Sequence, residues 1–463
     1  MPTINESNFW FNRIQKYILI SYFIVNIMLM IFSVPDAAYL MAADMAVSME
    51  PARSLISGNG FTHTNGEPFT WGTPLYPIFL AFFLGLFPWK LALCVIIVMQ
   101  CSLLYLIGLM THNIAKSFSQ KAAVLAQVLL IFNPNILISA HLLQTEILFT
   151  FFLTASTVMI FRYRDTLRWN FAMMVGVFIG LATMVRPVGQ FVIILLPLIF
   201  ILFLPNLSRN ELIRYFLAGM LAVFSALLII SPWIARNHSI FGKTFLTANT
   251  GMYLEAQYRQ LLHNGKGLSD ADTATLANDK LASHLLSINI KISELEKLSK
   301  IEQSQVLSSC YLEAILDEKF STHAKAIVLS MTELFISGGA SNLRNYLGIE
   351  GKNQIVEFQS RSVSSWMDSV FIFFAQVNFG YSALLIITFS YCIAMRILGI
   401  VGLFNIFGET STQSMVAILL LIITLSMSYL YLGQSRFRVP LEPYLAVIAA
   451  IGLESLRIRL GKK

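Results

Sequence analysis

Charged residues are scarce in this chain of 463 residues. Asp, Glu, Lys and Arg make up only 12% of it, whereas hydrophobic residues make up 56%. Because an ordinary soluble domain carries roughly a quarter charged residues, this composition excludes a water-soluble globular protein. The excess of 32 Lys and Arg over 25 Asp and Glu does not indicate a nucleic-acid partner, since the basic residues are scattered between apolar runs and form no stripe.

Cysteine is also rare. The four cysteines stand far apart in the sequence, at Cys94, Cys101, Cys310 and Cys392. None belongs to a CxxC pair, and none has a histidine at the spacing of a metal site. We therefore expect no disulfide framework, no structural metal and no bound cofactor.

Long apolar runs recur along the chain. A helix that spans a bilayer needs about 20 mainly apolar residues, because backbone polar groups find no water in the hydrocarbon and must bond within the helix. Runs of this kind occur near residues 17–34, 90–111, 122–138, 142–161, 169–185, 188–204, 215–233, 381–403, 414–432 and 441–456. They predict an all-α polytopic membrane protein.

The positive charges of the short connecting segments indicate the orientation. If the N-terminus is cytoplasmic, the inner segments hold thirteen Lys and Arg residues and the outer ones five. Because cytoplasmic loops are enriched in Lys and Arg, both termini are predicted to be cytoplasmic. The richness in Phe, Ile and Met and the absence of a disulfide pattern favour a bacterial inner membrane, whose outer face is periplasmic.

Two segments interrupt the succession of spans, and both fall on the predicted outer face. Residues 35–89 mix Gly, Pro, Asn and Thr with acids and then with apolar stretches broken by proline, which is typical of juxtamembrane helices. Residues 234–366 hold 13 Lys and Arg and 13 Asp and Glu and predict a mainly helical outer loop. Within it, Ser293 and Glu296 have the spacing of a capping box. The expected regions are an N-terminal membrane region (1–233), this outer loop (234–366) and a C-terminal membrane region (367–463).

Ionisable residues near the ends of the predicted spans are candidates for a site, since such groups are costly close to a bilayer. They gather on the predicted outer side: Asp36, Asp44, Glu50 and Arg53 in the first loop, and Glu146, Arg186, Arg236, Arg436, Arg438 and Glu442 at span ends. Guanidinium groups pair with phosphate oxygens through a two-pronged fork. This gathering therefore indicates a site for an anionic lipid headgroup, built from loops on a rigid helical scaffold.

Asp44 is the strongest candidate for a catalytic residue. It precedes a predicted helical turn, and two glycines further on permit a tight return of the chain. A carboxylate in such a loop can act as a general base toward an acceptor hydroxyl, and Glu50 is a second candidate. The structural alternatives are an N-cap role for Asp44, a helix-dipole role for Glu146 and contact of Arg436 and Arg438 with lipid phosphates.

Several short motifs follow one another in a fixed order. In the first loop, Asp44 stands eight residues before Ala52-Arg53, and Gly58-Asn-Gly-Phe61 and Thr73-Pro-Leu-Tyr-Pro77 follow. Later motifs are Asn133-Pro134, Thr145-Glu146, Arg186-Pro187, Pro232-Trp-Ile-Ala-Arg-Asn237, Phe241-Gly-Lys243 and Ser435-Arg-Phe-Arg-Val-Pro440. This ordered set resembles the GT-C glycosyltransferases, in the branch that contains protein O-mannosyltransferases and the lipid A aminoarabinose transferase. It covers nearly the whole chain apart from about residues 260–360.

The resemblance implies a GT-C-like bundle of about ten transmembrane helices and an integral membrane glycosyltransferase. Such an enzyme moves a sugar, usually with inversion, from a polyprenyl-phosphate donor to a lipid, glycan or protein acceptor on the outer side. The first-loop acid of the family falls on Asp44, and Glu50 is the substitute because the usual second acid is Met45 here. The motifs also imply donor-phosphate contacts at Arg186, Arg236, Lys243, Arg436 and Arg438, with Arg53 and Glu146 in support.

Two other functions fit the same residues. A transporter or flippase of an anionic lipid-linked substrate would also gather arginines near the membrane. Transporters, however, tend to place charged sites near the bilayer midplane and to show internal repeats, and the sequence has neither feature. A polymerase or ligase of lipid-linked glycans would use related chemistry with a larger donor.

The substitution Asp44→Asn tests the predicted general base. We expect the variant to remain folded and membrane-inserted but to lose sugar transfer from a polyprenyl-phosphate donor, since an amide cannot take the proton of the acceptor hydroxyl. The loss of a general base lowers the rate by about 10²- to 10⁴-fold. The measurement is the initial rate of transfer by purified protein in lipid, with Asp36→Asn as the matched control. A wild-type rate for Asp44→Asn would refute the assignment.

Overall fold

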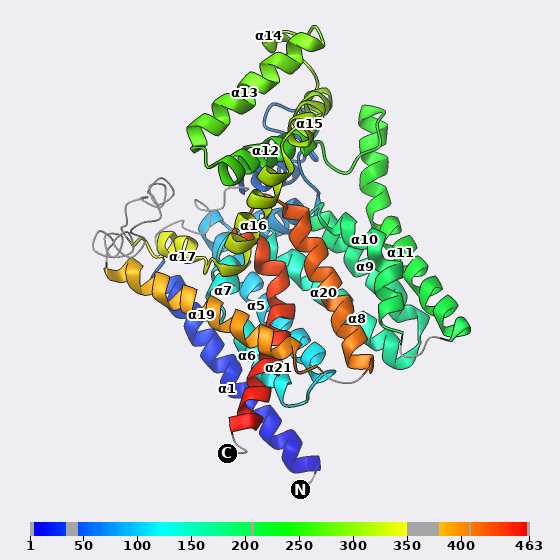
Figure 1. Ribbon diagram of the computed structural model, residues 1–463, viewed down its shortest axis with the longest axis vertical. Helices are drawn as coiled ribbons and strands as arrows, with labels where there is room; N and C mark the ends of the chain where they lie inside the picture. The colour runs from blue at the N-terminus through cyan, green and yellow to red at the C-terminus, as the bar shows by residue number, and fades with distance from the viewer. Residues whose placement is uncertain (1–3, 34–44, 205–207, 350–378, 407–408, 461–463) are drawn as a thin grey trace.

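The computed structural model describes residues 4–33, 45–204, 208–349, 379–406 and 409–460 (Figure 1). These residues are overwhelmingly helical, and an isolated bridge between Thr62 and Pro68 is the only β pairing among them. The helices form a bundle with a smaller helical domain projecting from one end, and the N- and C-terminal helices reach the opposite end (Figure 1). Asp44 and Asp36 lie outside the described residues.

Seven helical segments of the described residues are long and apolar enough to cross a membrane. They comprise α1 (Ile4–Ile31), α5 (Trp89–Lys116), α8 (Glu146–Thr166), α11 (Arg209–Phe241), α19 (Phe379–Leu403), α20 (Glu409–Tyr429) and α21 (Glu442–Leu460), the last preceded by the 3-10 turn η3 (Ser435–Leu441). Two shorter apolar helices, α9 (Trp169–Val185) and α10 (Gly189–Leu202), and the bent pair α6 (Ala122–Ile131) and α7 (Pro134–His141) cover the remaining predicted spans. The predicted all-α membrane bundle is confirmed.

The bend between α6 and α7 has a local cause. Asn133 is the N-cap of α7 and its side chain accepts a hydrogen bond from the backbone N–H of Asn135, while Pro134 occupies the first helical position. Proline is tolerated there because that N–H has no partner within the helix. The two axes therefore meet at 51°. The first turn of α7 contacts η3, where the side chain of Asn135 donates to the carbonyl of Ser435 at 2.9 Å.

Glycines let two pairs of membrane helices pack with their backbones in contact. An added Cβ at Gly176 of α9 would lie 2.0 Å from the carbonyl oxygen of Ala222 in α11. One at Gly402 of α19 would lie 2.0 Å from the carbonyl oxygen of Ile448 in α21. Small residues at such crossings allow close van der Waals packing, which holds helices together in lipid.

The first loop contains two short helices joined by a hairpin. These are α3 (Met45–Ile56) and α4 (Leu75–Leu86), which matches the predicted juxtamembrane helices. Gly58 and Gly60 follow α3 with φ values of +80° and +72°, so the chain returns through a conformation that favours glycine. The backbone N–H of Phe69 then donates to the carbonyl of Phe61 at 2.8 Å, which closes the hairpin.

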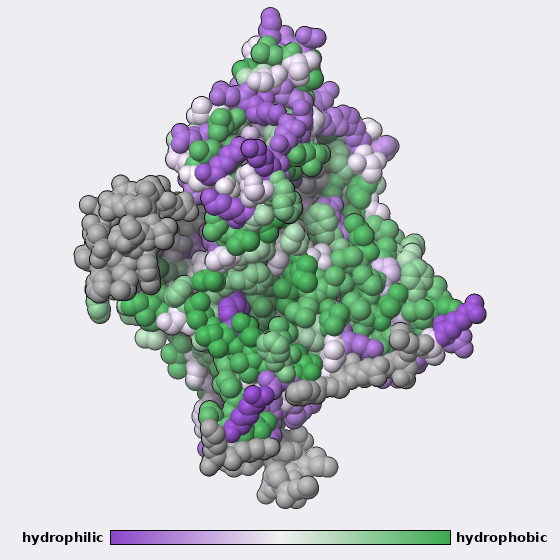
Figure 2. Space-filling model, in the orientation of Figure 1, coloured by the Kyte–Doolittle hydropathy of each residue, from purple (hydrophilic) through white to green (hydrophobic). Residues whose placement is uncertain are grey.

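The projecting domain is built from α12 (Thr250–Lys266), α13 (Asp270–Ser287), α14 (Ile292–Leu295), α15 (Lys300–Leu316) and α16 (Phe320–Ile336). Its surface is mainly hydrophilic, whereas the bundle below it presents a broad hydrophobic band (Figure 2). A small core holds it together, with Leu261, Cys310 and Tyr311 almost fully buried. α16 continues after a 51° bend into α17 (Ala340–Tyr346).

The prediction of a capping box at Ser293 and Glu296 was wrong. The box forms instead at Ser299, whose side chain accepts from the N–H of Glu302 while the Glu302 carboxylate accepts from Ser299. Both pairs match the same spacing, but only the second precedes a full-length helix with a buried apolar side, and α14 is a single turn. The helix that leaves the first membrane region, α11, continues past residue 233 to Phe241, and the three-part division of the chain stays a prediction.

The predicted orientation can be tested with matched cysteines at the two ends of the molecule. Leu286 in the projecting domain and Leu460 near the end of α21 are 76% and 71% exposed. In a background without the four native cysteines, we expect Leu286→Cys in whole cells to react with an impermeant maleimide. Leu460→Cys should react only after permeabilisation. The reverse pattern would show that the projecting domain is cytoplasmic.

Candidate active site

Arg186 and Glu146 form an ion pair at the end of the bundle that carries the projecting domain. Pro187 disfavours a helical conformation for the residue before it, so α9 ends at Val185 and Arg186 is extended. Its Nη1 lies 2.5 Å from Oε1 of Glu146 in the first turn of α8. Glu146 is only 1% exposed, and the N-terminal end of a helix favours a carboxylate.

Two aromatic rings extend this ion pair into a cluster. Tyr429, at the end of α20, stacks on Phe437 of η3 with the ring centroids 4.2 Å apart and the planes at 11°. The Arg186 guanidinium lies 6.0 Å from the first ring and 5.9 Å from the second. Arg436 lies 4.7 Å from the Phe437 ring. We call Glu146, Arg186, Tyr429, Arg436 and Phe437 the arginine cluster.

The projecting domain contacts the backbone of this cluster. Tyr253 of α12 donates from its hydroxyl to the carbonyl of Ser428 at 2.5 Å. Gln257, one turn later, donates to the carbonyl of Tyr429 at 3.1 Å and accepts from the N–H of Tyr431 at 3.0 Å. These bonds fix the aromatic ring of Tyr429 beneath the domain, so the arginine cluster lies where the bundle and the projecting domain meet.

Arg438 lies in a buried network beside the cluster. Its Nε donates to Oε1 of Glu442 at 2.6 Å, and both side chains are almost fully buried. Its two other nitrogens donate to the carbonyls of Leu334 and Ser337 at the end of α16. Arg396 of α19 donates to the neighbouring carbonyl of Phe335 at 2.9 Å and lies 3.9 Å from Glu442. The donor-phosphate role predicted for Arg438 stays a prediction, and its contacts here are structural.

Arg236 and Lys243 also contact protein groups. Arg236, near the end of α11, donates to the carbonyls of Phe61 and Phe69 at 2.9 and 2.8 Å and so holds both sides of the first-loop hairpin. Lys243 is exposed and lies 3.2 Å from the side chain of Gln305 in α15. Both residues thus link the end of α11 to the parts of the molecule that lie beyond the bundle.

Glu50 holds the tip of the hairpin against α3. Its carboxylate accepts from the backbone N–H of Thr64 at 2.6 Å, from the Thr64 hydroxyl and from Nδ1 of His63 at 2.9 Å. Burial raises the pKa of Glu50, but the hydrogen bonds from Thr64 and His63 outweigh this effect, and the net pKa lies below the usual range. An ionised carboxylate with three donors is a weak base, and this geometry favours a structural role over the predicted catalytic one.

Glu50, His63, Arg53 and Trp71 line an open cleft of about 980 Å³ between α3 and the hairpin. Arg53 is exposed, and its guanidinium lies 5.3 Å from the ring of Trp89. Among the described residues, no group of three His, Cys, Asp or Glu has the arrangement of a metal site. The structure therefore brings Glu146, Arg186 and Arg436 together in the arginine cluster, and Glu50 and Arg53 in this cleft. Arg236, Lys243 and Arg438 lie in neither.

The aromatic residues of the arginine cluster and of the cleft were not predicted as site residues from the sequence. Phe437 stands between Arg436 and Arg438 in the sequence, and an aromatic residue between two arginines is a signal that could have been read. The other three, Tyr429, His63 and Trp71, follow no local pattern. Each of them contacts a ring eight residues away across a turn of the chain, and that contact becomes visible only in the folded chain.

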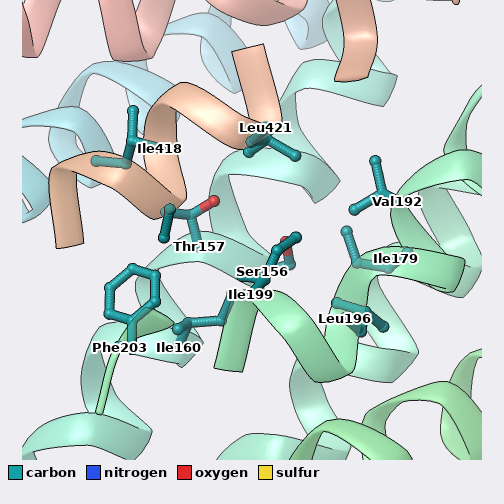
Figure 3. A pocket seen from close by; sticks show the side chains of 11 residues that line it. Ser156, Thr157, Ile160, Ile179, Val192, Leu196, Ile199, Phe203, Ile418 and Leu421 are labelled. Atoms are coloured by element: carbon teal, nitrogen blue, oxygen red, sulfur yellow. The ribbon is translucent and has the colours of Figure 1, made fainter. Parts of the chain in front are cut away.

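A small apolar crevice lies below the arginine cluster, among α8, α9, α10 and α20 (Figure 3). Its volume is about 20 Å³, which is enough for about one water molecule. The polar groups at its wall are the hydroxyls of Ser156 and Thr157, which bond to the carbonyl of Leu153 and to the Tyr444 hydroxyl. The crevice is therefore too small for an isoprenoid chain.

No protein-family model and no curated protein matches the sequence. Among solved structures, the oligosaccharyltransferase AglB from Archaeoglobus fulgidus, in complex with an inhibitory peptide and a dolichol-phosphate, is similar with a TM-score of 0.53 and 15% identity. The match covers 97% of this chain and 51% of that one. An oligosaccharyltransferase from Archaeoglobus fulgidus in the apo form gives a TM-score of 0.53, 15% identity, and coverage of 96% of this chain and 50% of that one.

The chain has the GT-C fold. This confirms the fold that the sequence motifs predicted. ArnT from Cupriavidus metallidurans bound to undecaprenyl phosphate also matches, with a TM-score of 0.39, 12% identity, and coverage of 96% of this chain and 78% of that one. The chain spans about half the length of the oligosaccharyltransferase, and the branch of the fold to which it belongs stays a prediction.

The two neighbouring arginines of η3 are expected to differ in their effect on stability. Arg438→Ala removes three hydrogen bonds and leaves Glu442 and two helix-end carbonyls short of partners. We expect it to lower the free energy of unfolding by about 3–5 kcal/mol, the range for a broken buried ion pair. Arg436→Ala, at a half-exposed side chain, is the control and should change it little. Unfolding of the detergent-solubilised protein in SDS measures both, and equal losses would contradict the assignment.

Proposed function

We propose that this chain is a membrane glycosyltransferase that transfers a sugar from a polyprenyl-phosphate donor to a lipid, glycan or protein acceptor. We place the reaction at the periplasmic face of a bacterial inner membrane, with inversion at the anomeric carbon. The observation that carries the proposal is the arginine cluster, which gathers two guanidinium groups at the end of a GT-C bundle.

In this proposal Arg186 and Arg436 bind the phosphate of the donor. Both lie within 6 Å of the Phe437 ring although they come from different segments, and the cluster carries two positive charges against the single carboxylate of Glu146. Guanidinium groups bind phosphate oxygens in a bidentate manner. The Glu146 carboxylate holds Arg186 in place at 2.5 Å and so orients its fork.

The reaction breaks the bond between the anomeric carbon and the phosphate oxygen, and it forms a new bond from that carbon to the acceptor oxygen. Negative charge collects on the departing polyprenyl phosphate, and preorganised cations stabilise such charge. We assign this role to Arg186 and Arg436. The proton of the acceptor hydroxyl goes to a base, for which Asp44, directly before the first residue of α3, remains our candidate.

Arg236, Lys243 and Arg438 hold the surroundings of the site in this proposal. Arg236 fixes the first-loop hairpin, Lys243 contacts the projecting domain, and Arg438 secures η3, which carries Arg436. The isoprenoid tail lies along the lipid-facing surface of the bundle, since the crevice of Figure 3 cannot contain it. A dolichol-phosphate in the similar AglB structure supports this class of donor.

Binding of undecaprenyl phosphate, without a sugar, tests the phosphate site. With the full chain in lipid nanodiscs, we expect Arg186→Gln and Arg436→Gln each to weaken binding about tenfold or more, because a hydrogen bond to a charged group is worth about 1.5–3 kcal/mol. Arg209→Gln and Arg457→Gln, at the opposite end of the bundle, are matched controls and should bind as the wild type does. Native mass spectrometry gives the bound fraction.

Two outcomes would contradict the assignment of Arg186 and Arg436 to the donor phosphate. If all four variants lose affinity equally, the binding depends on the overall positive charge and not on the arginine cluster. If wild-type protein binds neutral undecaprenol as tightly as the phosphate, no phosphate site exists and the proposed donor is wrong.

A further inference from the structure

The cleft of the first loop is a separate feature from the arginine cluster. It has a volume of about 980 Å³ and lies between α3 and residues 57–71. Two anchors hold its walls. Glu50 ties the hairpin tip to α3, and Arg236 ties the hairpin base to α11. The cleft therefore has the fixed walls expected of a preformed binding site.

His63, whose side chain lines this cleft, has one ring nitrogen without a partner among the described residues. The side chain of His63 is 9% exposed, and its Nδ1 lies 2.9 Å from the Glu50 carboxylate. Because a carboxylate accepts, Nδ1 carries the proton and the other ring nitrogen, Nε2, is an acceptor in the neutral ring. Nε2 is buried without a hydrogen-bond partner in the described part of the chain. Buried polar atoms are rarely left in this state, and a ligand hydroxyl is a suitable donor.

The remaining chemistry of the cleft is an aromatic ring and two nearby positive charges, one in its lining and one outside it. The Trp71 ring lies 5.1 Å from that of His63, and Nζ of Lys300 in α15 lies 5.9 Å from the Trp71 ring. Arg53 lines the same cleft. Among the described residues, neither Arg53 nor Lys300 forms an ion pair with an acid, whereas the charge of Glu50 is balanced by three donors.

We propose that the first-loop cleft binds an acidic saccharide, a sugar unit that carries a carboxylate or a phosphate. His63 Nε2 accepts a hydrogen bond from a sugar hydroxyl, Trp71 packs against the apolar face of the ring, and Arg53 pairs with the anionic group, aided by Lys300. Glu50 is a positioning residue, since it fixes the His63 ring through Nδ1. The binding inference stands on the cleft alone. That the bound saccharide is the acceptor of the transfer reaction is a second step, and this step rests on the proposed function.

An acidic peptide is the competing ligand. Its carboxylates would also pair with Arg53, but the partner that His63 Nε2 lacks is a single donor beside an aromatic ring. A peptide N–H is also a donor for Nε2, but an acidic peptide has no rigid apolar face that packs on Trp71. One sugar ring supplies the hydroxyl, the apolar C–H face and the anionic group together, so the saccharide accounts for His63, Trp71 and Arg53 at once.

Three probes of equal length distinguish these ligands. The full chain in nanodiscs is titrated with trigalacturonate, with neutral maltotriose and with triglutamate, and saturation-transfer NMR gives the dissociation constants. We expect trigalacturonate to bind at least tenfold more tightly than either other probe. His63→Phe keeps an aromatic ring but removes Nε2 together with the Nδ1 bond to Glu50, which keeps its two bonds from Thr64, and it should weaken trigalacturonate binding about tenfold. Arg53→Gln should abolish the preference for trigalacturonate over maltotriose.

Two control variants and three contrary outcomes complete the trigalacturonate experiment. His238→Phe and Arg209→Gln change the same residue types elsewhere and should bind trigalacturonate as the wild type does. The proposal fails if no probe binds, if triglutamate binds as tightly as trigalacturonate, or if Arg53→Gln, an exposed substitution, keeps the preference. Undecaprenyl phosphate is titrated with the same wild-type sample. Its failure to bind while trigalacturonate binds would refute the proposed donor and leave the cleft assignment standing.

Discussion

The buried carboxylate of Glu442 is the constraint around which the site end of the bundle is organised. It lies between Arg438 and Arg396, and both arginines also donate to the carbonyls that end α16. Positive charge is favourable at the C-terminal end of a helix. Arg438 and Arg396 therefore interact favourably with both the Glu442 carboxylate and the end of α16. The network joins α16 of the projecting domain to η3, α19 and α21.

This arrangement gives the two arginines of η3 different surroundings. A turn that buries Arg438 on one side presents Arg436 to the ring of Phe437. Phe437 in turn stacks on Tyr429, which the projecting domain holds through Gln257. The geometry of the arginine cluster is thus set by contacts that involve no ligand. Such preorganisation is what electrostatic stabilisation of a developing charge needs, because the cations do not have to move during the reaction.

The sequence predicted the membrane helices well because a span is a local property. Any run of about 20 apolar residues must close its own backbone hydrogen bonds in lipid, so α5 or α20 can be located without knowledge of their neighbours. The first-loop helices and the helical outer loop were located by the breaks in this pattern, where proline, glycine and charged residues replace the apolar runs. The capping box was placed one motif too early, since the spacing of Ser293 and Glu296 is satisfied equally by Ser299 and Glu302.

The sites were predicted only in part, since a charge near a span end can belong to a site or to the framework. Arg186 and Glu146 are 40 residues apart in the sequence, and motif order alone does not show that they touch. Arg436 and Arg438 have the same sequence surroundings, but Arg438 is fully buried and Arg436 is half-exposed. Glu50 was selected as an acid, whereas its three donors show a residue that holds a hairpin. The pairing of His63 with Glu50 requires the hairpin itself, which the sequence indicated only through its glycines.

The long helix α11 connects the lipid to the first-loop cleft. Its 33 residues correspond to a length of about 50 Å, which exceeds a hydrocarbon thickness of about 30 Å. Arg236, near the end of the helix, donates hydrogen bonds to both sides of the hairpin. Helices longer than the bilayer accommodate the mismatch by tilting. Because Arg236 bonds to the hairpin directly, the position of the hairpin follows that of the last turns of α11, beyond Pro232.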